Sequence, residues 1–480
     1  MKKLMLLTGI LVFLLFSCDG ELGNEDEEPV ETIDPIDEPG VVKKSFWAQS
    51  FIDGSFYTTE AGKLAVGTYC TVWVERGAGI DNDGAKKVAD EFDTKIYPKM
   101  LTNFGVTFED EEGEFTNIEY ADYMGDGDGK LAILLLDIKD GYKPPNNRAY
   151  TAGYFWSGDL LENVPTHPQF KYSNESDMIF IDTSPGLSEN AKNTYATLAH
   201  EMQHMMSFAT GILTREEDFD VWIDEGLSSA AEWIYLDDHT SNGRVNSYKA
   251  NSSGLINEGN NFFVWDNYED NNYAILDDYS TVYLFFQWLR LQTYSSIYKD
   301  IIASENYDYR TVTAAFNAKA SGDYSNWTTL LKTWLAANRI NSSSGIYGYK
   351  NETTLKDIKA PDAPAGANKT SILLYPGEGV YSKTTGDPSA SQNGNIRYAY
   401  LSSTTSEDTY NPSGTNTLLT YNVNTDGSDK TESGKTTGIA SASVVSEGRF
   451  IQSNEPIRLD GRDMLRRNGN ERNRVINDDR

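Results

Sequence analysis

Two histidines one helical turn apart are the residues of this chain best placed to do chemistry. They stand in the segment His200-Glu201-Met202-Gln203-His204. Residues i and i+4 share one face of a helix, so both imidazoles can reach a single metal ion while Glu201 lies beside the ion's open position. The chain has 4 His in 480 residues and two of them fall here, which makes chance a weak explanation. The spacing indicates metal-assisted hydrolysis; the alternative is an ordinary buried helix with hydrogen-bonded histidines.

A catalytic zinc ion needs a third protein ligand, and Glu225 is the candidate. It stands 21 residues after His204, near the start of a helix predicted from the apolar stripe at 227, 230, 231 and 234. The connection is long enough for the second helix to return alongside the first. An acid favoured there by the helix dipole is the alternative. Together with the histidine pair, Glu225 is better explained as a ligand.

These two segments carry a family resemblance. His-Glu-x-x-His followed by Trp-x-Asp-Glu-Gly-Leu at 222–227 resembles zinc metallopeptidases of the gluzincin kind, and more narrowly the hyicolysin family. Further stretches that resemble the family follow in a fitting order at 122–140, 153–155, 177–182 and 334–338. The resemblance implies a zincin-like catalytic domain, Zn²⁺ as the cofactor and polypeptide substrates.

Carried over residue by residue, the resemblance implies zinc ligands at His200, His204 and Glu225, with Glu201 as the general base. The chemistry of these residues agrees with those roles. Zinc lowers the pKa of a bound water and polarises a carbonyl, and a carboxylate one residue from a ligand can accept the proton of that water.

Two other residues are predicted to support the site. Glu232 lies two helical turns after Glu225, where it can accept a hydrogen bond from a zinc-bound imidazole; a solvated carboxylate is the alternative, and Asp224 is a less well placed candidate for the same role. Tyr279 begins a predicted helix at 279–291 and resembles the oxyanion donor of related peptidases. An ordinary surface or core aromatic is the alternative for Tyr279, and Ser280 replaces the glycine usual after that tyrosine.

The start of the chain indicates export. A positive N-terminus precedes an apolar run at 4–16 that is short for a membrane span, and Leu-Phe-Ser-Cys at 15–18 resembles a bacterial lipoprotein cleavage box. Cleavage would remove a signal peptide at 1–17 and leave a lipidated Cys18. We expect a lipid anchor to the bacterial cell envelope, at the outer membrane or cell surface. Because Phe16 replaces a small residue, a plain secretory signal or an uncleaved anchor stays open.

The net charge limits the kinds of partner, and the cysteine content indicates that Cys70 forms no disulfide. The formal net charge of −31 makes nucleic acid and anionic bilayers poor partners for the surface. Of the 2 Cys, Cys18 would carry lipid, so Cys70 is unpaired and is predicted to be a small buried residue in the strand 70–74. The sequence does not indicate an oligomeric state.

Pattern changes predict an α+β fold. An acidic, disordered tether at 18–44 precedes a sheet-containing subdomain at 45–189, and a helical zinc-binding subdomain follows at 190–345. A β-rich domain at 346–455 and a disordered tail at 456–480 end the chain. Within the sheet subdomain we expect strands at 69–74, 131–138 and 178–181, with one amphipathic helix at 86–103.

Weaker patterns leave several alternatives. Asp126-Gly127-Asp128-Gly129, with Asp137 at the twelfth position, resembles part of a Ca²⁺ loop or a plain turn. The strand 178–181 is either a sheet edge that receives an extended peptide or a buried central strand. Two functions compete with a peptidase: a surface adhesin that keeps the peptidase fold and binds through its β-rich domain, and zinc hydrolysis of a non-peptide bond.

Overall fold

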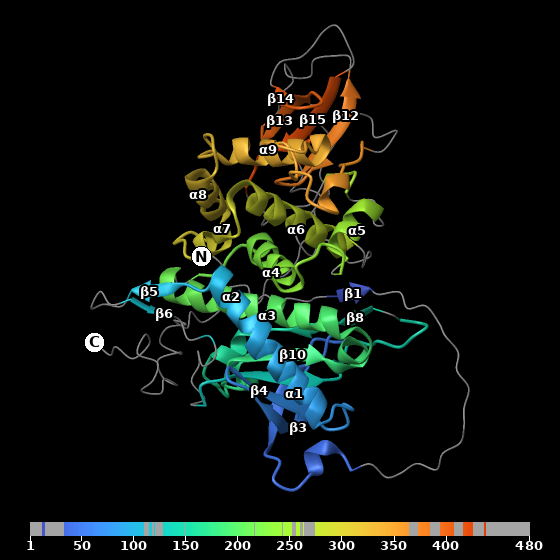
Figure 1. The fold of residues 1–480 in the computed structure, drawn as a ribbon, viewed down its shortest axis with the longest axis vertical. Helices are drawn as coiled ribbons and strands as arrows, with labels where there is room; N and C mark the ends of the chain where they lie inside the picture. Colours follow the sequence, from blue (N-terminus) through green and yellow to red (C-terminus); the bar gives the residue numbers. More distant parts are fainter. Residues whose placement is uncertain are drawn as a thin grey trace. The chain divides into compact units, whose positions relative to one another are not determined.

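The computed structural model describes most of the chain, namely residues 12–14, 33–109, 115–117, 120, 128–147, 149–215, 217–241, 243–251, 256–259, 263, 274–363, 373–384, 394–407, 416–425 and 436–437. The chain divides into two compact units, Met1–Glu216 with Ile457–Arg480, and Glu217–Pro456. The fold is α+β, as predicted: the first unit has a mixed sheet with helices, and the second has helices and a separate antiparallel sheet (Figure 1).

The first unit is built on a six-stranded sheet of order β2-β3-β4-β7-β10-β9. Neighbours β4, β7 and β10 run parallel and the other pairs are antiparallel. Every residue of β7 and β10 is buried, as expected for parallel strands covered on both faces. The strands are β2 (Lys43–Gln49), β3 (Phe56–Val66), β4 (Cys70–Glu75), β7 (Leu131–Leu136), β9 (Gly153–Tyr154) and β10 (Met178–Asp182).

The strand order decides between the two alternatives for the predicted strand at 178–181 and excludes the sheet edge. β10 lies between β7 and β9, so the predicted strand at 178–181 is the buried central strand. Among the described strands, β9 ends that side of the sheet. Cys70 begins β4 as a fully buried free cysteine, as predicted.

Each face of the sheet has its own cover. One face carries an apolar cluster that includes Trp73, Leu134, Tyr154, Trp156 and Phe180. α1 (Asn82–Glu91) packs against β3 and β4, and α3 (Ser188–Arg215) packs against β9 and β10 (Figure 1). The sheet therefore supports the long helix that carries the histidine pair.

The helix predicted at 86–103 is interrupted. It consists of α1 (Asn82–Glu91), a π-helical turn at Phe92–Ile96 and α2 (Tyr97–Phe104). Its apolar stripe repeats every four residues, which drifts around a regular helix of 3.6 residues per turn. A wider π turn reduces this drift, and the four stripe residues are all buried: Val88, Phe92, Ile96 and Met100.

Short elements complete the first unit. β1 (Val12–Leu14), within the predicted signal peptide, pairs with β8 (Ala149–Thr151), and β5 (Thr107–Glu109) pairs with β6 (Phe115–Asn117). The single helical turns are Pro35–Asp37, Ser157–Leu160, Phe170–Tyr172 and Thr183–Leu187.

Part of the predicted tether, from residue 33 on, lies within the described residues and is folded. Ile36 is fully buried, and Asp37 forms an ion pair with Arg76 at 2.6 Å. Gly62 allows this packing, because a Cβ there would lie 2.7 Å from Ile36 and 2.8 Å from Val41. Two apolar residues in an acidic segment were too weak a signal to predict it.

The second unit combines helices with an antiparallel sheet. The helices are α4 (Val221–Leu236), α5 (Arg244–Ala250), α6 (Ala274–Thr293), α7 (Ser296–Ile302), α8 (Tyr309–Lys319) and α9 (Trp327–Ile340), with one further turn at Leu355–Asp357. A four-stranded sheet of order β12-β15-β13-β14 packs through β13 and β15 on α9. These strands form the separate β region predicted near the C-terminus: β12 (Gly379–Thr384), β13 (Ile396–Leu401), β14 (Ser406–Glu407) and β15 (Asn416–Asn422), beside the pair β11 (Leu373–Leu374) and β16 (Thr436–Thr437).

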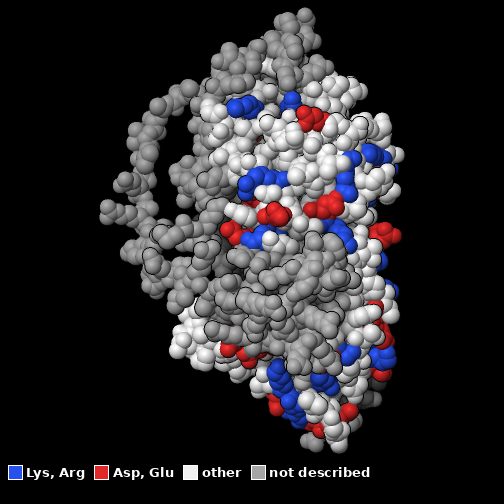
Figure 2. All heavy atoms as spheres, turned by 90° about the vertical axis from the view of Figure 1, so that its left-hand side faces the viewer, with Lys and Arg blue, Asp and Glu red and all other residues white. Residues whose placement is uncertain are grey.

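On the face seen in Figure 2, the described Lys and Arg side chains are interspersed with Asp and Glu. Among the described residues, ion pairs include Lys86–Asp90 at 2.5 Å and Lys95–Glu91 at 2.9 Å. None of the helices in the described ranges is long and apolar enough to cross a bilayer.

Several predictions concern residues outside the described ranges. Cys18, most of the signal peptide, the tether up to residue 32 and the tail at 456–480 are among them. The limits of the predicted domains also stay predictions.

Candidate metal centre

α3 places the two histidines of the motif on one buried face. His200 and His204 are 1% and 6% exposed, and their ring centroids lie 4.7 Å apart. Met202, Met205 and Met206 are fully buried on the same helix. Apolar packing on several sides thus fixes α3, and the i and i+4 spacing brings both imidazoles together as predicted.

The carboxylate of Glu201 is held by the backbone. Glu201 is fully buried, and its Oε2 accepts a hydrogen bond of 2.9 Å from the amide of Phe155, the residue after β9. The Phe155 ring also contacts Phe208 of α3, with 6.3 Å between centroids. The edge strand therefore orients the predicted base. Sequence reasoning missed this role of Phe155, because a backbone donor has no residue-type signal.

Glu225 lies in the first two turns of α4, where it is 3% exposed. Its Oε1 accepts a 3.1 Å hydrogen bond from the hydroxyl of Tyr279 on α6, and Tyr279 is 2% exposed. The next residue, Gly226, lets α4 approach α6, because a Cβ there would lie 2.2 Å from the Phe286 ring. A glycine thus brings the predicted oxyanion donor to the predicted ligand.

His200, His204 and Glu225 form a group that fits a metal ion. One ligand atom from each lies within 4.8 Å of the other two, and all three side chains are buried. Zinc ligands lie about 2.0–2.2 Å from the ion, so donors that share one ion are at most about 4.4 Å apart. Shifts of a few tenths of an ångström bring the atoms into range. Two imidazoles and one carboxylate are also a donor set of catalytic zinc sites.

Glu232 is buried, so it is not a solvated carboxylate. It is fully buried on α4 and forms an ion pair of 2.5 Å with Arg244 of α5, which is 4% exposed. Burial lowers the pKa of the Arg244 guanidinium, but the attraction and hydrogen bond of Glu232, together with Tyr279 and Glu225, outweigh it. The net shift of the pKa is upward, so Arg244 stays charged. A hydrogen bond from a zinc-bound imidazole to the Glu232 carboxylate stays a prediction.

Arg244 also connects to Tyr279. Its guanidinium carbon lies 4.5 Å from the centroid of the Tyr279 ring, a cation–π arrangement. Sequence reasoning missed Arg244, which stands in a polar stretch where nothing local distinguishes it from a surface arginine. What distinguishes Arg244 is its ion pair with the buried Glu232, which only the folded structure shows.

The segment that leads into α3 is fixed by Asp182 at the end of β10. Its carboxylate accepts hydrogen bonds from the amides of Gly186 at 2.8 Å and Ile138 at 3.2 Å. Burial raises the pKa of Asp182 to about 7, and the nearby carboxylates of Asp140 and Asp137 add to the shift. Near neutral pH, the support of α3 therefore includes a titrating carboxyl group.

The predicted Ca²⁺ loop is described only in part, because Asp126 and Gly127 lie outside the described residues. Asp128 forms an ion pair of 3.5 Å with Lys63, and Gly129 adopts a φ of 72° before β7. These features belong to a turn before the strand, and Ca²⁺ binding stays a prediction.

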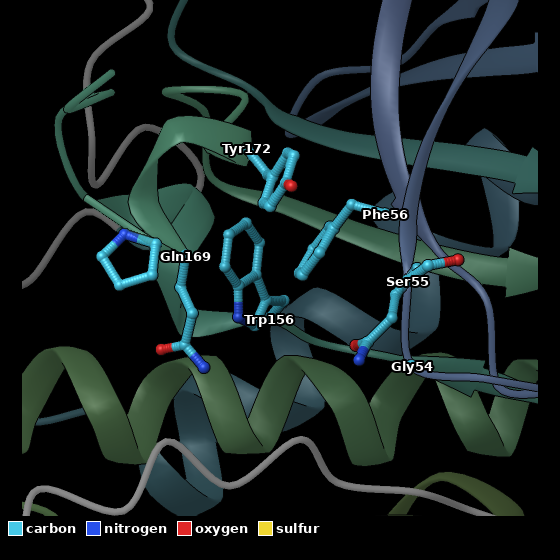
Figure 3. Close-up of a pocket in the computed structure, with 8 residues that line it drawn as sticks. Gly54, Ser55, Phe56, Trp156, Gln169 and Tyr172 are labelled. Carbon is cyan, nitrogen blue, oxygen red and sulfur yellow. The ribbon is translucent and has the colours of Figure 1, made fainter. Parts of the chain in front are cut away.

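A separate hollow of about 330 Å³ lies in the first unit. Figure 3 shows the rings of Phe56, Trp156 and Tyr172 close together with Gln169 beside them. Phe56 and Tyr172 stack on each other at 4.5 Å between centroids. Trp156 belongs to the apolar cluster on one face of the sheet, whereas Phe155 contacts α3. The residues that line the hollow do not include Glu201 or the three candidate metal ligands.

Comparison with known proteins agrees with this metal group. Residues 194–283, which include the three candidate ligands and Tyr279, match the family model "Protein of unknown function (DUF1570)". The chain is also similar to neutral metalloprotease ShpI of Staphylococcus hyicus, with 32% identity over 271 residues, 53% of this chain and 54% of the relative. The chain thus spans about half the length of that relative. The similarity supports assignment of the chain to a metalloprotease family.

Proposed function

We propose that this protein is a hyicolysin-type zinc metalloendopeptidase that hydrolyses peptide bonds in polypeptide substrates. The observation that carries the proposal is the buried group His200, His204 and Glu225, with ligand atoms within 4.8 Å of one another. Glu201, adjacent to one of these histidines, supplies the carboxylate that hydrolysis needs. The similarity to a neutral metalloprotease supports the same activity.

Each side chain has a defined task in this reaction. A zinc ion bound by the three ligands would lower the pKa of a water molecule and polarise the scissile carbonyl. Glu201 accepts a proton from the attacking water and delivers it to the leaving amine, so the C–N bond breaks as the new C–O bond is kept. The Phe155 amide fixes the orientation of the Glu201 carboxylate through its 2.9 Å hydrogen bond.

Tyr279 is proposed as the donor to the developing oxyanion. A hydroxyl group held in place can stabilise charge that forms in the transition state. Its hydrogen bond of 3.1 Å to Glu225 keeps the hydroxyl beside a ligand of the proposed metal, and the single O–H turns from Glu225 to the oxyanion as the charge develops. Burial of Tyr279 excludes water, which would weaken such a hydrogen bond.

The proposed place of action is the bacterial cell envelope. The apolar run at 4–16 and Cys18 support an exported lipoprotein, and the acidic segment after Cys18 supports a tether between lipid and enzyme. Proteins outside the cytoplasm are then the substrates, and the net charge of −31 argues against nucleic acid as a partner.

The test compares the purified native chain with Glu201→Gln and with Glu189→Gln, an exposed glutamate of the same helix. Zinc per chain is measured first, and then cleavage of unfolded casein. We expect about one zinc ion in all three proteins and a loss of about 10²–10⁴-fold in rate for Glu201→Gln alone. Full activity of Glu201→Gln would overturn the assigned base. A zinc-loaded native chain that cleaves no polypeptide would favour the adhesin.

A further inference from the structure

Arg244 lies next to the proposed site without being one of its ligands. We propose that Arg244 is a positioning residue, which holds the Tyr279 ring so that its hydroxyl stays on Glu225; this inference rests on the proposed zinc site. Glu225 and Glu232 lie on α4, Arg244 on α5 and Tyr279 on α6, all within the second unit. Three helices thus contribute to one buried network.

The first link fixes the plane of the guanidinium. Arg244 donates from Nη2 to one oxygen of Glu232 at 2.5 Å and from Nε to the other at 3.3 Å. A two-point contact between a planar guanidinium and a carboxylate fixes the orientation of both groups. Both side chains are buried, so water does not compete for these hydrogen bonds.

The second link joins the guanidinium to the tyrosine ring. The Arg244 Cζ lies 4.5 Å from the ring centroid of Tyr279. A desolvated cation over an aromatic face is attracted to it, which resists tilting of the ring away from the cation. The hydroxyl stands at the far end of the side chain, so a rotation of the ring by about 10° about Cβ moves the hydroxyl by about 1 Å. Displacements of that size affect reaction rates strongly.

The third link is the hydrogen bond of 3.1 Å from the Tyr279 hydroxyl to Glu225. Arg244 therefore acts on both the ligand and the oxyanion donor through one aromatic ring. Folding stability alone is a weak explanation for the network, because well-packed apolar residues can often replace a buried ion pair without lowering the stability of a protein. A positioning role explains why both charges are placed beside a ligand.

The substitution of Arg244 by lysine separates the effect of the positive charge from the effect of the planar guanidinium. Arg244→Lys keeps a cation near Glu232 but lacks the planar fork that fixes the guanidinium over the ring. We expect kcat to fall by at least about tenfold with little change in KM, because substrate contacts remain. We also expect the dissociation constant for zinc to rise by about threefold to tenfold, since Glu225 loses its fixed partner.

The experiment is a double-mutant cycle of Arg244→Lys and Tyr279→Phe in the full chain. It measures kcat and KM on unfolded casein, the dissociation constant for zinc by chelator competition, and the melting temperature. If Arg244 acts through the Tyr279 hydroxyl, Arg244→Lys lowers kcat and zinc affinity in the native background and has little further effect once that hydroxyl is absent. Additive effects of the two substitutions would overturn the proposal.

Two other variants complete the design. Arg310→Lys changes an exposed arginine paired with Asp308, and we expect kcat and zinc affinity to match the native chain. If Arg244→Lys fails to fold, Glu232→Gln loosens the same fork, and its effect on zinc affinity must also depend on Tyr279. The zinc measurements need no catalysis, so they test Arg244 even if the chain cleaves no peptide. Coupling of positions 244 and 279 supports the proposal, and its absence contradicts it.

Discussion

Gly226→Ala is the substitution by which the packing of α4 on α6 can be tested most sharply. A Cβ at position 226 would lie 2.2, 2.4 and 2.8 Å from three carbons of the Phe286 ring. Ordinary contact begins near 3.4 Å, so the ring or the helix must move by more than 1 Å. Phe286 is fully buried and has little room to move. The substitution should therefore push α4 away from α6.

Two opposing effects set the magnitude. Alanine in place of a helical glycine favours the helix by about 1 kcal/mol. Overpacking a buried interface costs about 1–3 kcal/mol, and a clash of this depth belongs near the upper value. We expect a net loss of about 2 kcal/mol in the free energy of unfolding. Since Glu225 is the preceding residue, a displacement near 1 Å should also lower kcat by about 100-fold.

Urea unfolding and casein cleavage measure these effects, with Phe286→Leu as the matched second substitution. Leucine lacks the Cε2 and Cζ carbons at 2.2 and 2.8 Å and can rotate its δ carbons away, so alanine at 226 should be neutral or slightly stabilising in that background. Activity should recover in part. The explanation would be falsified if Gly226→Ala destabilised both backgrounds equally, or if it stabilised the native background.

Three other predictions concern separate parts of the chain. Tyr279→Phe should lower kcat by about 10²–10³-fold with little change in KM, and an unchanged kcat would exclude Tyr279 as the oxyanion donor. The pKa of Asp182 is raised to about 7, so its neutral form stabilises the fold at low pH and this contribution is lost as the pH rises through 7. Between pH 5 and 8 the native chain should lose about 2–3 kcal/mol more than Asp182→Asn, while the exposed Asp53→Asn should leave the slope unchanged; equal slopes for the native chain and Asp182→Asn would contradict the shift. Cys18→Ala should no longer incorporate radioactive fatty acid, and labelling of the variant would exclude lipidation at that residue.

The metal group was largely predictable from sequence because its spacing is local. His200 and His204 lie one turn apart on any helix, and the need for a third ligand directed attention to Glu225. The supporting contacts were not predictable in the same way. The Phe155 amide and the Arg244 guanidinium reach the site by tertiary packing, and neither has a local pattern.

In the fold, too, the local elements were predictable from sequence and the tertiary arrangement was not. Apolar runs predicted the strands β4, β7 and β10, but not whether β10 is an edge strand or a buried one. The position of β10 within the sheet depended on β9, a strand of two residues that includes Gly153 and is too short to recognise by alternation. The π turn at Phe92–Ile96 was hidden because its residues continue a helical stripe.

The most direct measurement of the proposed metal centre is anomalous diffraction at the zinc absorption edge from crystals of the full chain. We expect one strong peak about 2.0–2.2 Å from a ring nitrogen of His200, a ring nitrogen of His204 and a carboxylate oxygen of Glu225. A zinc peak bound to other residues, or no peak at this group in crystals grown with zinc, would contradict the proposed site.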